Sequence, residues 1–152
     1  MEKYSKILIG TAVAGVLAGG LWWSSNAVES DTDVITRRGM HWHPELAVYV
    51  RGERQIIPAD IGIGTQYAGF PGYDGAMGMA GVHTHDATGV IHFEFGGLVR
   101  EKDLTLGEFF RVWGKDMRAF GSNVRMTVNG KESVEYENYM MRDGDKIELR
   151  YE

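Results

Sequence analysis

The spacing of apolar and polar residues predicts several short strands in this chain. From His43 to Val50, Leu46 and Val48 alternate with more polar neighbours, which is typical of a half-buried strand. Residues 55–57 follow an Arg-Gly turn and precede a proline, so we expect them to return as the second strand of a hairpin.

Three more strands are expected further along, over residues 90–95, 124–128 and 146–151. The first of these has an apolar face opposite His92 and Glu94. The last should bury alternate residues, namely Ile147, Leu149 and Tyr151. Tight turns are predicted before the last strand by two dipeptides, Asn129-Gly130 and Asp143-Gly144.

One helix is well marked between these strands. Thr105 and Glu108 form a capping-box pattern at its start, and Gly114 is typical of a helix end. The residues between them place four apolar side chains on one face: Leu106, Phe109, Phe110 and Trp113.

The order of these elements predicts an α+β fold. A hairpin, an inserted segment, a helix, a strand, a turn and a closing strand match a β-grasp, or ubiquitin-like, mixed sheet with one main helix. A small antiparallel sandwich or barrel is the alternative.

The N-terminal part of the chain differs sharply in composition from the rest. Residues 7–23 carry no charge and follow two lysines, which predicts a transmembrane helix with residues 1–6 in the cytoplasm. A cleaved signal peptide is the rival interpretation. In either case residues 24–36 form a linker, and residues 37–152 form a single domain outside the cytoplasm. The prediction is a single-pass protein of the cell membrane.

Composition excludes several classes of function. The chain has no cysteine, so thiolate copper centres and cysteine-held iron–sulfur clusters are ruled out. A net charge of -5 without a basic stripe argues against nucleic-acid binding.

All five histidines lie between positions 41 and 92, as two His-x-His pairs and one single histidine. Residues two apart in a strand point to the same face, so each pair offers two nitrogens in one direction. If the first and third strands share a sheet, their polar faces converge. The predicted metal ligands are His41, His43, His83, His85 and His92.

Other groups near the histidines extend this site. Asp86, Glu94 and Glu45 are placed to orient the imidazoles, and Asp86 or Glu94 is also a candidate direct ligand. The glycine-rich stretch 62–81, expected to fold over the histidines, contributes Met77 and Met79, and Met40 precedes the first pair. Thioether sulfur selects Cu(I), which makes copper the first metal and zinc the second.

Several segments together resemble a family of membrane-anchored or secreted bacterial and archaeal proteins. The resemblance covers nearly the whole predicted domain, and its paired-histidine motifs are the most specific part. It implies no particular activity. The chain departs from the family in the long loop before His83. The segments that carry the resemblance are residues 41–46 (HWHPEL), 57–63 (IPADIGI), 83–92 (HTHDATGVIH), 104–114 (LTLGEFFRVWG) and 128–131 (VNGK).

These observations support three functional hypotheses. The first is a membrane-anchored copper-binding protein that captures or delivers metal, or that serves a larger membrane metalloenzyme complex. The second is an enzyme with a mononuclear zinc or copper centre. The third is a protein-interaction module whose histidines only brace the glycine-rich loop.

Overall fold

The structure is a computed structural model that describes residues 31–152. Residues 33–152 form one compact unit, which contains all five histidines. The predicted transmembrane segment, residues 7–23, lies outside the described residues. Within residues 31–152, no helix has the length and apolar character needed to cross a membrane.

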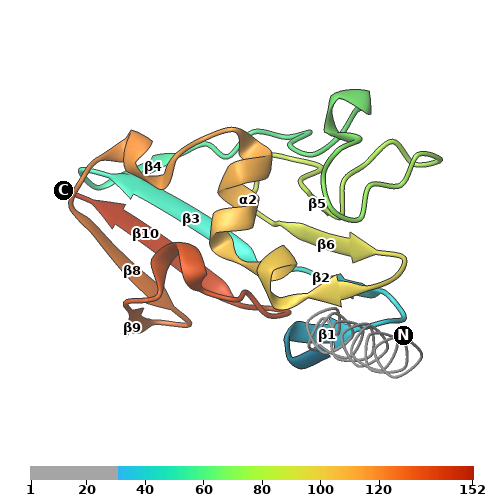
Figure 1. Ribbon diagram of the computed structural model, residues 1–152. Coiled ribbons are helices and arrows are strands. Elements are labelled where there is room, and N and C mark those ends of the chain that lie inside the picture. The colour runs from blue at the N-terminus through green and yellow to red at the C-terminus, as the bar shows by residue number, and fades with distance from the viewer. Residues whose placement is uncertain (1–30) are drawn as a thin grey trace, which may run out of the picture. The chain divides into compact units, whose positions relative to one another are not determined.

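The larger sheet has five strands in the order β4-β3-β10-β8-β9. At its centre β10 runs parallel to β3 and antiparallel to β8, so the sheet is mixed (Figure 1). The buried side chains of β10 are Ile147, Leu149 and Tyr151, which confirms the alternation predicted from the sequence. The strands span Glu45–Val50 (β3), Glu53–Gln55 (β4), Val124–Val128 (β8), Lys131–Ser133 (β9) and Lys146–Tyr151 (β10).

The hairpin of β3 and β4 corrects one prediction. The second strand was expected at residues 55–57, but β4 ends at Gln55. The turn is tight, with both Arg51 and Gly52 at positive φ, and pairing begins at once with Val50 opposite Glu53. Ile56 therefore leaves the sheet and is 76% exposed.

The histidine-bearing strands form a second sheet in the order β2-β6-β5. Their bounds are Met40–Trp42 (β2), His92–Phe95 (β6) and Val82–His83 (β5). The condition that the first and third predicted strands share one sheet is met only in part, because the His41 segment pairs with β6 whereas β3 pairs with β10. The chain leaves β2 at Trp42 and enters the larger sheet only at Glu45, so the segment 41–50 serves two sheets.

A two-stranded sheet pairs β1 (Val34–Thr36) with β7 (Val99–Arg100). β1 falls within the stretch predicted as a linker, and the Arg100 guanidinium reaches the Asp33 carboxylate beside it at 2.7 Å. Short 3-10 turns complete the described elements, at Asp31–Asp33, Thr65–Tyr67, Glu101–Leu104, Met117–Phe120 and Tyr136–Asn138.

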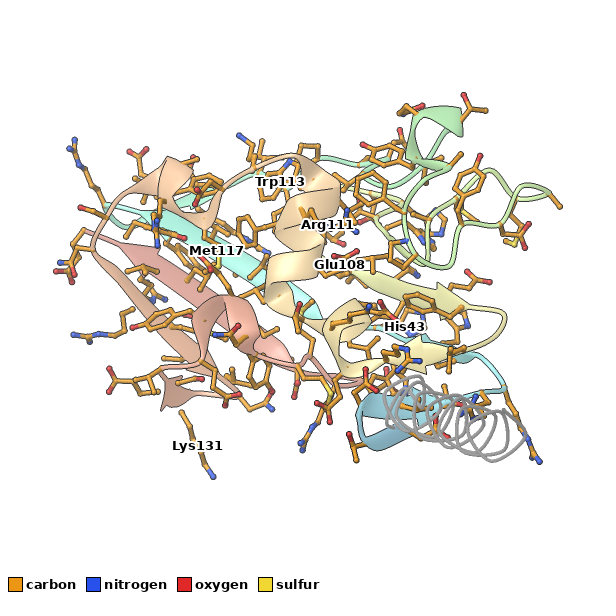
Figure 2. All side chains as sticks on the ribbon, in the orientation of Figure 1. His43, Glu108, Arg111, Trp113, Met117 and Lys131 are labelled. Carbon is orange, nitrogen blue, oxygen red and sulfur yellow. The ribbon has the colours of Figure 1, made fainter. Side chains whose placement is uncertain are left out.

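The single α-helix of the described region, α2, spans Leu106–Trp113. Its start is capped by Thr105, whose hydroxyl accepts the Glu108 N–H at 3.1 Å, and its end is Gly114 in the left-handed conformation. Both ends confirm the prediction. The Glu108 carboxylate, which the predicted capping box would direct to the Thr105 N–H, instead accepts a hydrogen bond from the Arg111 guanidinium at 2.6 Å (Figure 2).

One hydrophobic core joins the helix to both the five-stranded and the three-stranded sheets. Phe109 of α2, Leu46 and Leu149 of the larger sheet, and Phe93 of the smaller one are all fully buried in the same cluster. The described region is thus a mixed α+β domain, as predicted. The helix packs against the same core as Phe93, and the histidines lie on the other, polar face of the three-stranded sheet.

Candidate metal centre

The register of the three-stranded sheet brings the histidines to one face. His83 of β5 lies opposite His92 of β6, and His41 of β2 lies opposite Glu94 of the same strand. Side chains of directly paired residues point to the same side of a sheet. The intervening Phe93 points to the other side and is buried in the core. The alternation predicted from the sequence is therefore correct, although the sheet is a different one.

All five histidines converge on this face as two triads that share His92. The outer triad is His41, His43 and His92, and the inner triad is His83, His85 and His92. Within each triad the three ligand nitrogens lie within 4.8 Å of one another. The His92 ring centroid is 4.8 Å from that of His43 and 4.6 Å from that of His85. Figure 2 shows His43 beside β2 and β6.

The inner triad is held in a geometry suited to a metal ion. His83 is 1% exposed, and its Nδ1 lies 3.0 Å from the Ala80 carbonyl oxygen. A carbonyl can only accept, so Nδ1 carries the proton and the lone pair on Nε2 faces His85. That Nε2 lies 3.2 Å from the Nε2 of His85. Two nitrogens on one tetrahedral zinc ion, each about 2.0–2.1 Å from the metal, would lie about 3.3–3.4 Å apart.

Thr84, between the paired histidines, fixes this segment to the rest of the domain. It is fully buried, its hydroxyl donates to the Pro58 carbonyl at 2.9 Å, and the same oxygen accepts the Ile61 N–H at 3.1 Å. Sequence reasoning missed this residue. The buried hydroxyl anchors the backbone that carries His83 and His85.

The outer triad has an acidic neighbour that the sequence did not reveal. The carboxylate of Asp143 accepts the backbone N–H of His43 at 2.8 Å and lies 3.9 Å from the ring Nδ1 of the same residue. Asp143 was expected only to start a turn. It is far away along the chain, so no local spacing could have linked it to the site.

The carboxylates named from the sequence lie around the triads, not within them. Asp86 accepts hydrogen bonds from the backbone and hydroxyl of Thr88, and these bonds lower the pKa of its carboxyl. Glu94 faces His41 across the β2–β6 pair. Glu45 belongs to β3 and pairs with Lys146 of β10 in the larger sheet.

The glycine-rich loop packs beside the histidine face. The ring of Phe70, in this loop, stacks against the Arg111 guanidinium of α2, with 4.4 Å between the ring centroid and the guanidinium carbon. A cavity of about 270 Å³ lies between the loop and the sheet. Its lining includes Met77 and Met79 from the loop and His41 and His83 from the two triads.

Burial keeps two of the candidate ligands, His83 and His92, neutral. It lowers the pKa of His83, against the opposing effect of the bond to the Ala80 carbonyl. Partial burial, followed by the charge that His85 and His83 would carry, lowers the pKa of His92 to about 4. At neutral pH these two imidazoles are therefore uncharged and each has an unprotonated ring nitrogen, as metal ligation requires.

The same shifts predict that the metal-free domain loses stability in mild acid. Below pH 6.5 His83 and His92 are protonated in the unfolded chain but stay largely neutral in the folded chain. The free energy of unfolding therefore falls as the pH drops from 6.5 towards 4. After allowing for the partial exposure of His92, we expect a loss of about 1–2 kcal/mol between pH 7 and pH 5. Urea unfolding of the metal-free chain at pH 7 and at pH 5 measures this loss of unfolding free energy.

A His83→Gln/His92→Gln variant is the control for this measurement, because it removes both groups. Its stability should vary less between pH 7 and pH 5 than that of the wild type. An equal change in unfolding free energy between pH 7 and pH 5 in the two proteins would contradict the assignment of this effect to His83 and His92.

Comparison with known proteins adds no relative to this description. No protein-family model, no curated protein and no solved structure matches the chain. Any functional conclusion therefore rests on the geometry and chemistry of the two triads.

Proposed function

We propose that this protein binds a transition metal ion, most favourably copper, through its histidine cluster and takes part in metal capture or delivery. The observation that carries the proposal is the pair of triads that share His92. Five imidazoles from three segments of chain are brought to one sheet face. Imidazole nitrogen is a ligand for copper, zinc, nickel and iron.

The accessibility of the site supports exchange of the metal rather than permanent retention. His41, His43 and His85 are exposed, His92 is half-buried, and only His83 is buried. An ion could therefore meet the outer triad first and pass to the inner triad while His92 remains a ligand. Structural zinc sites, by contrast, are closed by four protein ligands.

Copper is preferred over zinc because of the second type of donor at the site. Met77 and Met79 share a cavity with His41 and His83, and thioether sulfur favours copper in its cuprous state. Zinc remains the alternative metal, since three nitrogens suit it equally well.

The proposed setting combines the fold with the N-terminal segment. We assign the domain to the β-grasp class, supported by the central parallel pair β3 and β10 in a mixed five-stranded sheet with one helix. Residues 7–23 would anchor it in the cell membrane, with the histidines outside the cytoplasm. A larger membrane metalloenzyme complex is the partner that this arrangement suits.

Metal titration of the full-length chain, purified without a polyhistidine tag, tests the proposal. We expect near-stoichiometric copper or zinc by elemental analysis. A His83→Ala/His85→Ala variant should lose more affinity than a His41→Ala/His43→Ala variant, because the inner triad is the better fixed of the two. Equal, weak binding by all three proteins would refute the proposal and favour a protein-interaction module.

A metal-dependent enzyme is the second candidate function. The observation in its favour is the cavity beside the triads, which is large enough for a small substrate and bears the Glu94 carboxylate. An ion held by three histidines keeps a position for water, whose pKa zinc would lower. Hydrolysis of an activated ester by the zinc-loaded chain, abolished in the inner-triad variant, would favour this candidate over the carrier.

A further inference from the structure

We propose that the cavity between the glycine-rich loop and the histidine face is a binding site for a cuprous ion, with Met77 and Met79 as its sulfur ligands. This inference rests on the proposed function and deepens it, because it names the oxidation state of the metal that is taken up. The ion would enter as Cu(I) and bind without a change of oxidation state.

The cavity is lined by residues that carry thioether, imidazole and carboxylate groups. Its lining joins both methionines and Asp74 of the loop to Glu94 of β6, to His41 of the outer triad and to His83 of the inner triad. It is thus continuous with both triads. A cation in it would have acidic side chains nearby to offset its charge.

Core packing does not explain why an apolar methionine stands at position 77. Its side chain is 54% exposed although it is large and apolar. Its backbone is nevertheless fixed, because the Asp74 carboxylate accepts the N–H of Ala76 at 2.7 Å and that of Met77 at 3.2 Å. The Gly78 N–H binds the Asp74 carbonyl at 2.7 Å and closes the turn. The loop therefore fixes the backbone of Met77 and leaves its side chain exposed beside the cavity.

Met79 immediately precedes Ala80, the residue that orients His83 of the inner triad. The Met79 carbonyl accepts the Asp74 N–H at 2.8 Å, which places it in the same turn as Met77. The next residue, Ala80, accepts the hydrogen bond from His83 and donates its own N–H to Gly62 at 2.8 Å. One short hydrogen-bonded segment thus carries the two thioethers and orients an imidazole.

The chemistry of these donors selects a soft, monovalent ion. Thioether sulfur is a good ligand for Cu(I) and a poor one for zinc, whereas imidazole accepts both. Methionine side chains are flexible and polarizable, so two of them can close around an ion together with His41 or His83. Zinc should therefore use only the triads, and Cu(I) should also use the cavity.

Cu(I) and Zn(II) affinities of a Met77→Leu/Met79→Leu variant of the full-length chain test this inference. Leucine keeps the apolar bulk and removes the sulfur. We expect Cu(I) affinity, measured anaerobically by competition with a chromophoric Cu(I) chelator, to fall about tenfold or more. Zn(II) affinity should stay within about twofold of wild type. X-ray absorption of the Cu(I)-loaded wild type should show sulfur neighbours that the variant lacks.

Met140→Leu is the matched control. Met140 is a partly buried methionine that forms a β-bridge with Thr105, and it does not line the cavity. This variant should bind both ions like the wild type.

Two results would overturn the inference: unchanged Cu(I) affinity in the double variant, or an equal fall in Cu(I) and Zn(II) affinity. In either case the proposed function stands as long as the wild type binds metal through its histidines. A wild type that binds neither ion removes the proposed function itself.

Discussion

Replacing His92 by alanine should weaken copper and zinc binding about 100-fold or more, the largest loss from any single substitution in the cluster. His92 is the one residue that belongs to both triads. Loss of another histidine leaves one triad complete, whereas loss of His92 reduces both to two nitrogens. Competition titrations of five single His→Ala variants measure this order directly.

Glu94→Gln is the matched control for this substitution. Glu94 stands two residues from His92 on the same face of β6, but it is not a member of either triad. Its change to an amide should alter affinity only a few fold, about fivefold at most. A loss as large as that of His92→Ala would show that Glu94 is a direct ligand. Wild-type affinity in the His92→Ala variant would remove the shared-ligand arrangement.

The side of the sheet on which the histidines lie was predictable because it depends on the period of a strand. His41 and His43, and likewise His83 and His85, are two residues apart, and His92 alternates with buried Ile91 and Phe93. This local pattern fixes the side for the residues inside strands, and His43 and His85 lie just beyond the ends of β2 and β5. The convergence itself also required that these strands share a sheet, which the sequence could state only as a condition.

The assignment of strands to sheets could not be read in the same way. Alternation continues from His41 to Val50 in the sequence, yet β2 pairs with β6 while β3 pairs with β10. The change of partner depends on residues about one hundred positions away along the chain. No local pattern records it.

The sequence did not reveal the residues that support the site, because their contacts also join distant parts of the chain. Thr84 acts through the Pro58 carbonyl, 26 positions earlier, and Asp143 contacts His43 across 100 positions. The sequence marked Asp143 only as a turn residue and gave Thr84 no role. By contrast, the cap of α2 by Thr105 and its end at Gly114 involve close neighbours, and both were predicted.

Replacing Gly62 by alanine should destabilise the domain by about 2–4 kcal/mol and displace the inner triad. Gly62 has φ +77, and a Cβ there would lie 2.3 Å from the Val82 carbonyl oxygen and 3.0 Å from the Cβ of His83. The obstacle is backbone that cannot easily move, because Val82 is paired with Phe93 in β5 and β6.

Gly69→Ala separates this effect from a general intolerance of the glycine-rich loop. Its added Cβ would meet no heavy atom within 4 Å, so we expect a change in unfolding free energy of no more than about 0.5 kcal/mol. Urea unfolding of both metal-free variants compares them. If the contact between Gly62 and β5 positions the inner triad, Gly62→Ala must also lose zinc affinity under conditions in which it is still folded. An equal, small effect of both substitutions would mean that the loop yields at Gly62, and that hydrogen bonds alone hold His83 in place.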